Sequence, residues 1–173
     1  IVTAALTDFK RAFDADGGSI GGSTWAAAER EYASWLTHYQ EQYGYYDLFL
    51  IARNGDVVFT AAGESDLGQS VTNGPLADSP LAHCFQKGLK QAALQDFEPY
   101  APSGGKFAGF VGAPVKQGDQ VIGVVALQLP TGPINKIVQR RDGMGKTGET
   151  YLVARQNGRT GLRSDITTMG DGK

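Results

Sequence analysis

Apolar residues near the start of the chain recur at helical spacing. Between residues 1 and 14 they lie three or four positions apart, as on one face of an α-helix. A glycine-rich stretch over residues 16–23 then interrupts the pattern, because glycine is costly inside a helix. A second segment, from about residue 23 to residue 43, has the same spacing. Its apolar members are Trp25, Ala28, Tyr32, Trp35, Leu36, Tyr39 and Tyr43. The pattern predicts two amphipathic helices, with this stripe, including Trp35, packed into the core rather than serving as a stacking platform.

The spacing changes to that of β-strands after residue 46. The runs 47–53 and 57–60 are rich in β-branched and aromatic residues, and the dipeptide Asn54-Gly55 between them is typical of tight hairpins. We therefore expect two antiparallel strands here.

A loop and a third helix are expected next. Residues 61–77 contain small turn residues and no sustained period, which is typical of a loop. Ser79 and Pro80 supply an N-cap and a first-turn proline. The third helix is predicted to run from Pro80 to about Ala92.

Three further strands are predicted at 97–100, 107–115 and 121–129, joined by glycine-containing turns. They form an antiparallel meander. Its two longer strands are apolar on both faces, so helices or loops are expected to cover both sides of the sheet. Thr131 is expected to cap a last helix that ends near Gly143.

Composition narrows the classes of function. The chain has 173 residues, 41% of them hydrophobic, and a net charge of −2. This suits a globular domain and gives no surplus of positive charge for nucleic acid or anionic lipid. One cysteine and two histidines cannot form an internal disulfide or a His/Cys zinc site. We expect no nucleic-acid partner, no metal and no cofactor.

One hairpin sequence occurs twice. The segment 49–55 returns as 151–158 with one inserted glutamine, and the distance between the copies is about the length of a small domain. Two similar hairpins could arise by chance. A tandem repeat instead predicts one complete unit that ends near Arg141, followed by the first hairpin of a second unit, so that the chain is a fragment of a longer protein.

Six segments carry a resemblance to a known family: 46–51, 55–60, 64–68, 96–103, 123–130 and 147–153. Together with the order of elements, they resemble the double Cache sensor domains of bacterial chemoreceptors and of related sensor kinases and cyclases. The amino-acid sensors of that family carry an Arg-x-Trp-Tyr cluster, which residues 30–35 do not reproduce. The resemblance therefore extends to architecture and not to amino-acid ligands.

The resemblance implies an α+β fold with a PAS-like antiparallel sheet, flanked by a long N-terminal helix and followed by the start of a second PAS-like module. The implied domains are a helical segment at 1–45, a membrane-distal Cache module at 46–141 and a truncated second module at 147–173. It further implies a periplasmic location in a parent protein anchored in the inner membrane by two helices that are absent here.

Candidate ligand-binding residues lie along the predicted meander: Asp96, Tyr100, Ser103, Phe110 and Gln128. A carboxylate at the start of a covered strand must be paired or solvated, so Asp96 either contacts a ligand or has a structural partner. Gln128 is a polar residue on an otherwise apolar strand face. Small residues in the meander leave room for a ligand, or else they allow a helix to pack closely.

Two acidic residues of the predicted loop are further candidates. Glu64 and Asp66 could coordinate a cation or accept hydrogen bonds from a ligand ammonium group, or they simply solvate the loop. No nucleophile, phosphate-loop or metalloprotease motif is present, so an enzyme is not expected.

The sequence thus predicts a ligand-binding extracytoplasmic sensor domain of a methyl-accepting transmembrane chemoreceptor, which binds a small molecule and signals through its helices. The alternative is a structural or dimerisation module of a sensor kinase or cyclase with no ligand of its own. A homodimer would in either case form through the N-terminal helices.

Overall fold

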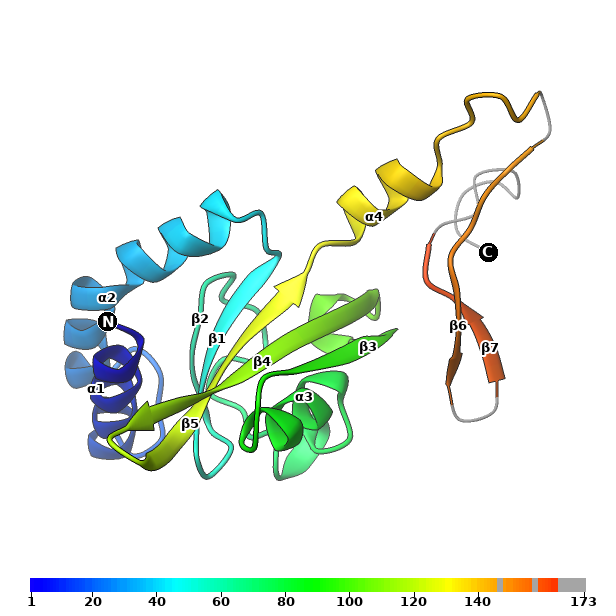
Figure 1. The fold of residues 1–173 in the computed structure, drawn as a ribbon. Helices are drawn as coiled ribbons and strands as arrows, with labels where there is room; N and C mark the ends of the chain where they lie inside the picture. The colour runs from blue at the N-terminus through cyan, green and yellow to red at the C-terminus, as the bar shows by residue number, and fades with distance from the viewer. Residues whose placement is uncertain (146–147, 157–158, 165–173) are drawn as a thin grey trace. The chain divides into compact units, whose positions relative to one another are not determined.

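The computed structural model describes residues 1–145, 148–156 and 159–164, and the chain divides into two compact units between Leu129 and Pro130 (Figure 1). Each unit is described by itself. The predicted domain boundaries at 45, 141 and 147 stay a prediction, because compactness alone does not show which segments fold independently.

The first unit is an antiparallel sheet with helices on both faces. Its helices are α1 (Val2–Ala15), α2 (Ser23–Gln42) and α3 (Pro80–Gly88), with short 3-10 turns η1 (Gly74–Leu76) and η2 (Ala101–Ser103). Its strands are β1 (Asp47–Ala52), β2 (Val57–Thr60), β3 (Ala93–Pro99), β4 (Phe107–Gln117) and β5 (Gln120–Leu129), in the spatial order β2-β1-β5-β4-β3. The α+β fold with a covered antiparallel sheet is therefore confirmed.

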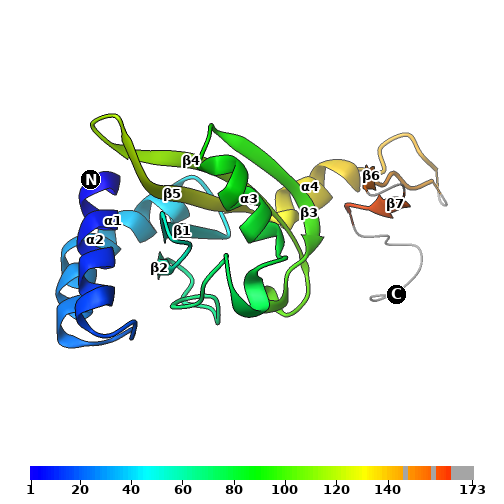
Figure 2. The same cartoon turned by 90° about the horizontal axis from the view of Figure 1, so that it is seen from below.

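Two cores hold these layers together, one on each face of the sheet. Helices α1 and α2 pack Leu6, Phe9 and Leu36 against one face, while α3 and the loop after β2 pack against the other (Figure 2). The second core includes Phe49 and Phe110. Since successive strand residues point to opposite faces, the doubly apolar strands β4 and β5 contribute to both cores, as predicted, and β1 does so as well.

The aromatic stripe of α2 is buried only in part. Trp25 is buried and donates a hydrogen bond from Nε1 to the Val58 carbonyl at 2.9 Å. Trp35, in contrast, is 41% exposed, so its predicted core position is wrong. Neighbouring helix residues point about 100° apart, and the buried Leu36 takes the inward direction at this turn. Trp35 stacks instead on Tyr39, with ring centroids 5.8 Å apart.

The predicted extent of the third helix is also wrong. Ser79 caps α3 by accepting a hydrogen bond from the Ala82 amide at 3.1 Å, but the helix ends at Gly88 and not near Ala92. Strand β3 then begins at Ala93, four residues earlier than predicted. Ala93 and Leu94 have no marked β-propensity of their own. They belong to the strand because they pair with Gly112 and Val111 of β4.

The second unit contains α4 (Thr131–Val138) and a hairpin of β6 (Val153–Gln156) and β7 (Arg159–Leu162). Pro130 occupies the N-cap position in place of Thr131, and α4 ends before the predicted Gly143. Within the described residues, β6 and β7 pair with each other in a sheet of their own. The predicted turn at 157–158 and residues 165–173 lie outside the described part, and the truncated second module stays a prediction.

Candidate functional site

Four of the five predicted site residues meet on the α3 side of the sheet. Asp47 of β1, Gln128 of β5 and Phe110 of β4 are register partners across three adjacent strands, so their side chains share one face. Tyr100 and Ser103, between β3 and β4, reach the same place through the contacts described next. We call the polar part of this region the acidic site; it consists of Asp47, Glu64, Asp66, Tyr100, Ser103 and Gln128.

Asp66 and Tyr100 form the buried centre of the acidic site. The Tyr100 hydroxyl donates to Asp66 Oδ2 at 2.8 Å, and both side chains are fully buried. The Tyr100 ring meets Phe110 edge to face, with centroids 5.1 Å apart. This aromatic contact fixes the hydroxyl that holds the loop carboxylate.

Glu64 links the loop to the rest of the site. Its Oε1 accepts from the Tyr46 hydroxyl at 2.7 Å and its Oε2 from Ser103 Oγ at 2.9 Å. Ser103 Oγ in turn accepts from Gln128 Nε2 at 3.1 Å. Glu64 is half-buried and Tyr46 is exposed, so these two residues form the solvent edge of the site.

Asp47 anchors the beginning of the loop. Its Oδ1 accepts from the backbone amides of Leu48, Ala61 and Ala62 at 2.6, 2.8 and 2.9 Å. The residue opens β1 next to the end of β2, where the chain leaves the sheet. The carboxylate therefore supplies an acceptor to backbone amides at the point where the strand pairing ends, and the Ala61 amide also donates to the Leu48 carbonyl at 3.0 Å.

Burial alters the electrostatics of the acidic site. It raises the pKa of the Asp47 carboxyl from 3.8 to about 7, against the lowering effect of its backbone amide partners. Burial also raises the pKa of Asp66, although the Tyr100 hydrogen bond opposes this. The pKa of Tyr100 is raised by burial first and by the Asp66 charge second. Ionised carboxylates are thus held here at an energetic cost.

The site has more buried acceptors than donors. Asp47 Oδ2, Asp66 Oδ1 and Gln128 Oε1 are buried and have no hydrogen-bond partner. Leaving a buried polar atom unpaired costs on the order of 1 to 3 kcal/mol. Within the described residues, no group of His, Cys, Asp and Glu has the arrangement to hold a metal ion. The chemistry that suits these atoms is an N–H or O–H donor, and a cationic donor suits them best.

Asp96 is not joined to the other four predicted residues by these bonds. It lies half-buried on the edge strand β3, and its Oδ1 accepts from the Phe97 amide at 2.8 Å. The strand register shifts at this point, between Gln95 and Glu98. The geometry places Asp96 at an irregularity of the edge strand rather than in the acidic site.

Asp47 was missed by the sequence reasoning. It stands directly before four apolar residues of β1, a strand that is buried on both faces. A charge beside a doubly buried strand must itself be buried, and a buried charge needs partners or a function. That signal was present in the sequence.

The small residues of the meander serve close packing. A Cβ added at Gly112 would lie 2.7 Å from Cys84 Sγ, and one added at Gly109 would lie 2.9 Å from the Phe97 ring. Helix α3 and the edge strand therefore occupy the room that these glycines provide. Of the two alternatives for the small residues, the structure favours packing.

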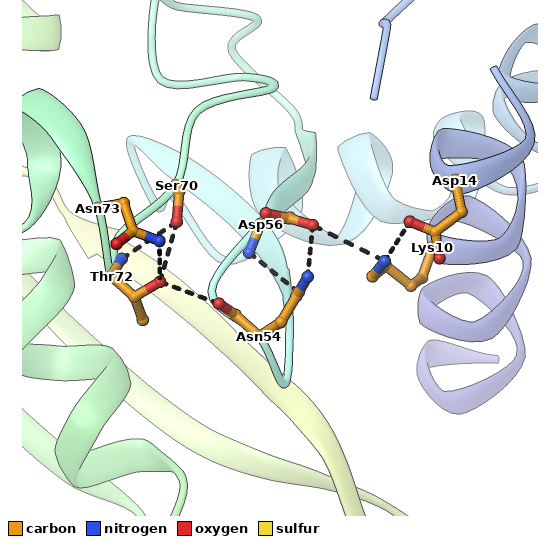
Figure 3. Close-up of polar contacts among 7 residues, drawn as sticks. All are labelled: Lys10, Asp14, Asn54, Asp56, Ser70, Thr72 and Asn73. Carbon is orange, nitrogen blue, oxygen red and sulfur yellow. Dashed lines mark hydrogen bonds and ion pairs between the residues drawn. The ribbon is translucent and has the colours of Figure 1, made fainter. Parts of the chain in front are cut away.

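A second polar cluster lies at the far end of the same loop. We call it the turn network; it consists of Lys10, Asp14, Asn54, Asp56, Ser70, Thr72 and Asn73 (Figure 3). Thr72 Oγ1 donates to the Asn54 carbonyl at 2.9 Å, and Asn54 Nδ2 donates to Asp56 Oδ2 at 2.7 Å. Lys10 of α1 forms ion pairs with Asp56, at 3.7 Å, and with Asp14. Gly55, at φ 98°, is required because a Cβ would lie 2.6 Å from Thr72.

Comparison with solved structures identifies the architecture. The sensor domain of the V. cholerae histidine kinase DctB matches with a TM-score of 0.55 and 18% identity over 67% of this chain. The ligand-binding domain of the Campylobacter jejuni chemoreceptor Tlp3, in complex with 4-methylisoleucine, matches with a TM-score of 0.53 and 10% identity over 93% of this chain and 80% of its own. The chain has a Cache-type sensor-domain fold.

A third structure with the Cache-type fold is the ligand-binding domain of the Pseudomonas fluorescens chemoreceptor CtaA in complex with L-serine. It matches with a TM-score of 0.52 and 10% identity over 96% of this chain and 63% of its own. The present chain spans 43% of the length of the DctB chain. No protein-family model and no curated protein matches the sequence.

The acidic site lies between the Cache-type sheet and the loop that follows β2. Tyr100, Asp66 and Gln128 are buried, so in this structure the loop is closed over the sheet. None of the described helices is both long and apolar enough to cross a membrane.

Proposed function

We propose that this chain is the extracytoplasmic ligand-binding part of a transmembrane chemoreceptor of the methyl-accepting type, and that its acidic site binds the cationic group of a small molecule. The proposal is supported by the fold and, above all, by the three unpaired buried acceptors of the site. A fold by itself does not imply a function. The unpaired acceptors are the observation that carries the proposal.

An ammonium group fits these acceptors better than a neutral donor does. The described ion pairs join Lys10 to Asp14 and Asp56, and Arg11 to Asp8, away from the acidic site. Asp47 and Asp66 therefore lack a cationic partner there. A ligand ammonium would supply both charge and up to three donors, and hydrogen bonds to charged groups are the stronger ones.

A ligand screen by thermal shift tests the proposal. The panel pairs each amine, including amino acids, ethanolamine and putrescine, with a compound of the same carbon skeleton that lacks the amino group. At 100 times its dissociation constant a ligand adds about 2.7 kcal/mol of stability. We expect stabilisation by at least one amine and by none of the uncharged partners. The absence of any stabilising amine would contradict the proposal.

Matched variants locate the binding site. Asp66→Asn keeps the size of the side chain and an acceptor for Tyr100 but removes the charge, so amine binding should weaken at least tenfold by calorimetry. Asp56→Asn makes the same chemical change in the turn network and should leave the affinity unchanged. Equal losses in both variants would show that the effect does not arise in the acidic site.

One observation favours the alternative, a dimerisation module of a sensor kinase or cyclase. The rings of Trp35, Tyr39 and Tyr43 follow one another along α2, and Trp35 and Tyr43 are exposed. Sedimentation of the protein and of Trp35→Ala over a range of concentrations tests it. Dimers that Trp35→Ala abolishes, in a protein that no amine stabilises, would favour this alternative.

A further inference from the structure

Two of the unpaired acceptors of the acidic site belong to residues that lie directly opposite each other on neighbouring strands. Asp47 and Gln128 are register partners of β1 and β5, and side chains of such a pair share a face with their Cβ atoms about 5 Å apart. Gln128 Nε2 is committed to Ser103, which leaves Oε1 without a donor. Asp47 Oδ1 is committed to three amides, which leaves Oδ2 without one.

A single proton on Asp47 satisfies both atoms. Oδ1 already accepts from three donors, so Oδ2 is the oxygen with room for a proton. A protonated carboxyl donates one hydrogen bond, and Gln128 Oε1 is the unpaired acceptor on the facing residue. Without that proton, two residues that are register partners each keep a buried oxygen with negative charge or partial charge and no donor.

The other groups around Asp47 favour the proton. Glu64 and Asp66 approach from the loop, Tyr100 from the segment after β3, and Tyr46 precedes Asp47 in the chain. The Asp66 charge raises the pKa of Asp47, the Glu64 charge raises the pKa of Asp66, and the charges of all three carboxylates raise the pKa of Tyr100. The Thr60 hydroxyl, at the end of β2, acts on the pKa of Asp47 in the opposite direction and lowers it.

We propose that the unliganded acidic site holds a proton on Asp47, donated from Oδ2 to Gln128 Oε1, and that a cationic ligand group displaces it. This deepens the proposed function and rests on it. When the cation enters, the proton leaves Asp47 for solvent and the ionised carboxylate faces the ligand charge. When the cation leaves, a proton returns from solvent.

The exchange makes ligand binding sensitive to pH near neutrality. Burial raises the pKa of Asp47 to about 7, so the proton is present in slightly acidic surroundings and absent in alkaline ones. If one proton is displaced per ligand, the apparent affinity weakens about tenfold for each pH unit below that value. The site would thus report a cationic compound jointly with acidity.

Carbon-13 NMR of the unliganded 173-residue chain tests the inference without any ligand. The Asp47 carboxyl carbon, assigned through its bonds to the backbone, is followed from about pH 4 to about pH 9. We expect the chemical shift of this carbon to change with a midpoint near pH 7. The chemical shift of the Gln128 side-chain carbonyl carbon should change with the same midpoint. An Asp47 midpoint near the ordinary 3.8, or a Gln128 carbonyl that does not follow Asp47, would overturn the inference.

Two variants sharpen the assignment. Asp47→Asn should abolish the titration of the Gln128 carbonyl, whereas Asp56→Asn in the turn network should leave both midpoints within about 0.3 units. Should Asp47→Asn fail to fold, the unmodified protein still gives both midpoints. The outcome is separate from the ligand screen: a failed screen refutes the proposed function, and a normal Asp47 midpoint with amine binding intact refutes the proton alone.

Discussion

The acidic site and the turn network lie at the two ends of one loop, and they pair their polar groups in opposite ways. In the turn network, Lys10 neutralises Asp56, and Asn54 both donates to and accepts from that residue. In the acidic site, three carboxylates have hydroxyl and amide partners, and three buried acceptor atoms have none. Both clusters tie the same loop to the sheet.

The difference supports the proposal that the acidic site binds a ligand, whereas the turn network is a structural cluster. A cluster that only fastens a loop reaches its lowest energy when every donor meets an acceptor. A binding site gives up part of that stability so that a ligand can complete it. In the turn network, which only fastens the loop, the polar groups are paired with one another. In the acidic site, three buried acceptors are left without a donor.

The largest expected effect is the dependence of stability on pH. The pKa of Asp47 is raised in the folded state from 3.8 to about 7, so the folded protein binds this proton more tightly than the unfolded chain. The contribution of Asp47 to the free energy of unfolding is therefore greatest below about pH 4 and decreases as the pH rises to about 7. At 1.36 kcal/mol per pKa unit the loss is on the order of 4 kcal/mol.

Urea melts at several pH values measure this loss. Asp47→Asn should flatten the slope between about pH 4 and pH 7 and be more stable than the unmodified protein at about pH 8, because its amide keeps the Oδ1 acceptor and gives Gln128 a donor. Asp56→Asn should retain the slope. If Asp56→Asn flattened it as well, the distinction between the two clusters would fail.

Tyr100→Phe is expected to have the next largest effect. The change removes the Tyr100 donor to Asp66 Oδ2, in a buried carboxylate whose Oδ1 already has no partner. The cost should be about 1 to 3 kcal/mol at pH 7, while the packing of the ring on Phe110 is preserved. Denaturant melts measure the loss, and a protein protonated at Asp66 at low pH should lose less. A loss independent of pH would point to the ring rather than to the hydrogen bond.

The smallest effect is expected in the turn network. Asp56→Asn removes the charge that faces Lys10 at 3.7 Å, in a partly solvated place. Ion pairs of this kind contribute about 0 to 1 kcal/mol, and salt weakens them. Melts at low and high salt should show a difference that disappears at high salt. A loss above about 2 kcal/mol would mean that the network carries strain or coupling that its geometry does not show.

Local patterns predicted much of the fold. The hairpin around Asn54-Gly55 formed between β1 and β2, and Ser79 capped α3 as expected. These signals are local, because turn and cap chemistry act within a few residues. The beginning of β3 depends instead on a separate part of the chain. Ala93 and Leu94 belong to a strand because they pair with residues of β4. The place of Trp35 depended on which of two adjacent residues turns inward, and periodicity alone does not decide that.

Sequence patterns likewise predicted part of the candidate site and missed the part that depends on pairing between distant strands. Tyr100, Ser103, Phe110 and Gln128 were found along the predicted meander, Gln128 as a polar residue on an otherwise apolar strand face. Asp47 comes from a strand about eighty positions earlier in the chain than Gln128, and only the register of β1 on β5 brings the two together. Pairing across such a separation is set by the whole sheet, so the residue that most changes the chemistry of the site was the hardest to find.

The loop over the acidic site is also bonded along the outer edge of β2. The Val57 amide donates to the Gln69 carbonyl and the Gly68 amide to the Val57 carbonyl, both at 2.9 Å. If the proposed ligand reaches the buried acceptors by displacing this loop, these bonds must open first, and capture would then be slower than free diffusional encounter. Release is gated by the same bonds. A protein with the proposed ligand-binding function would then average over brief fluctuations in ligand concentration and respond to those that outlast one opening of the loop.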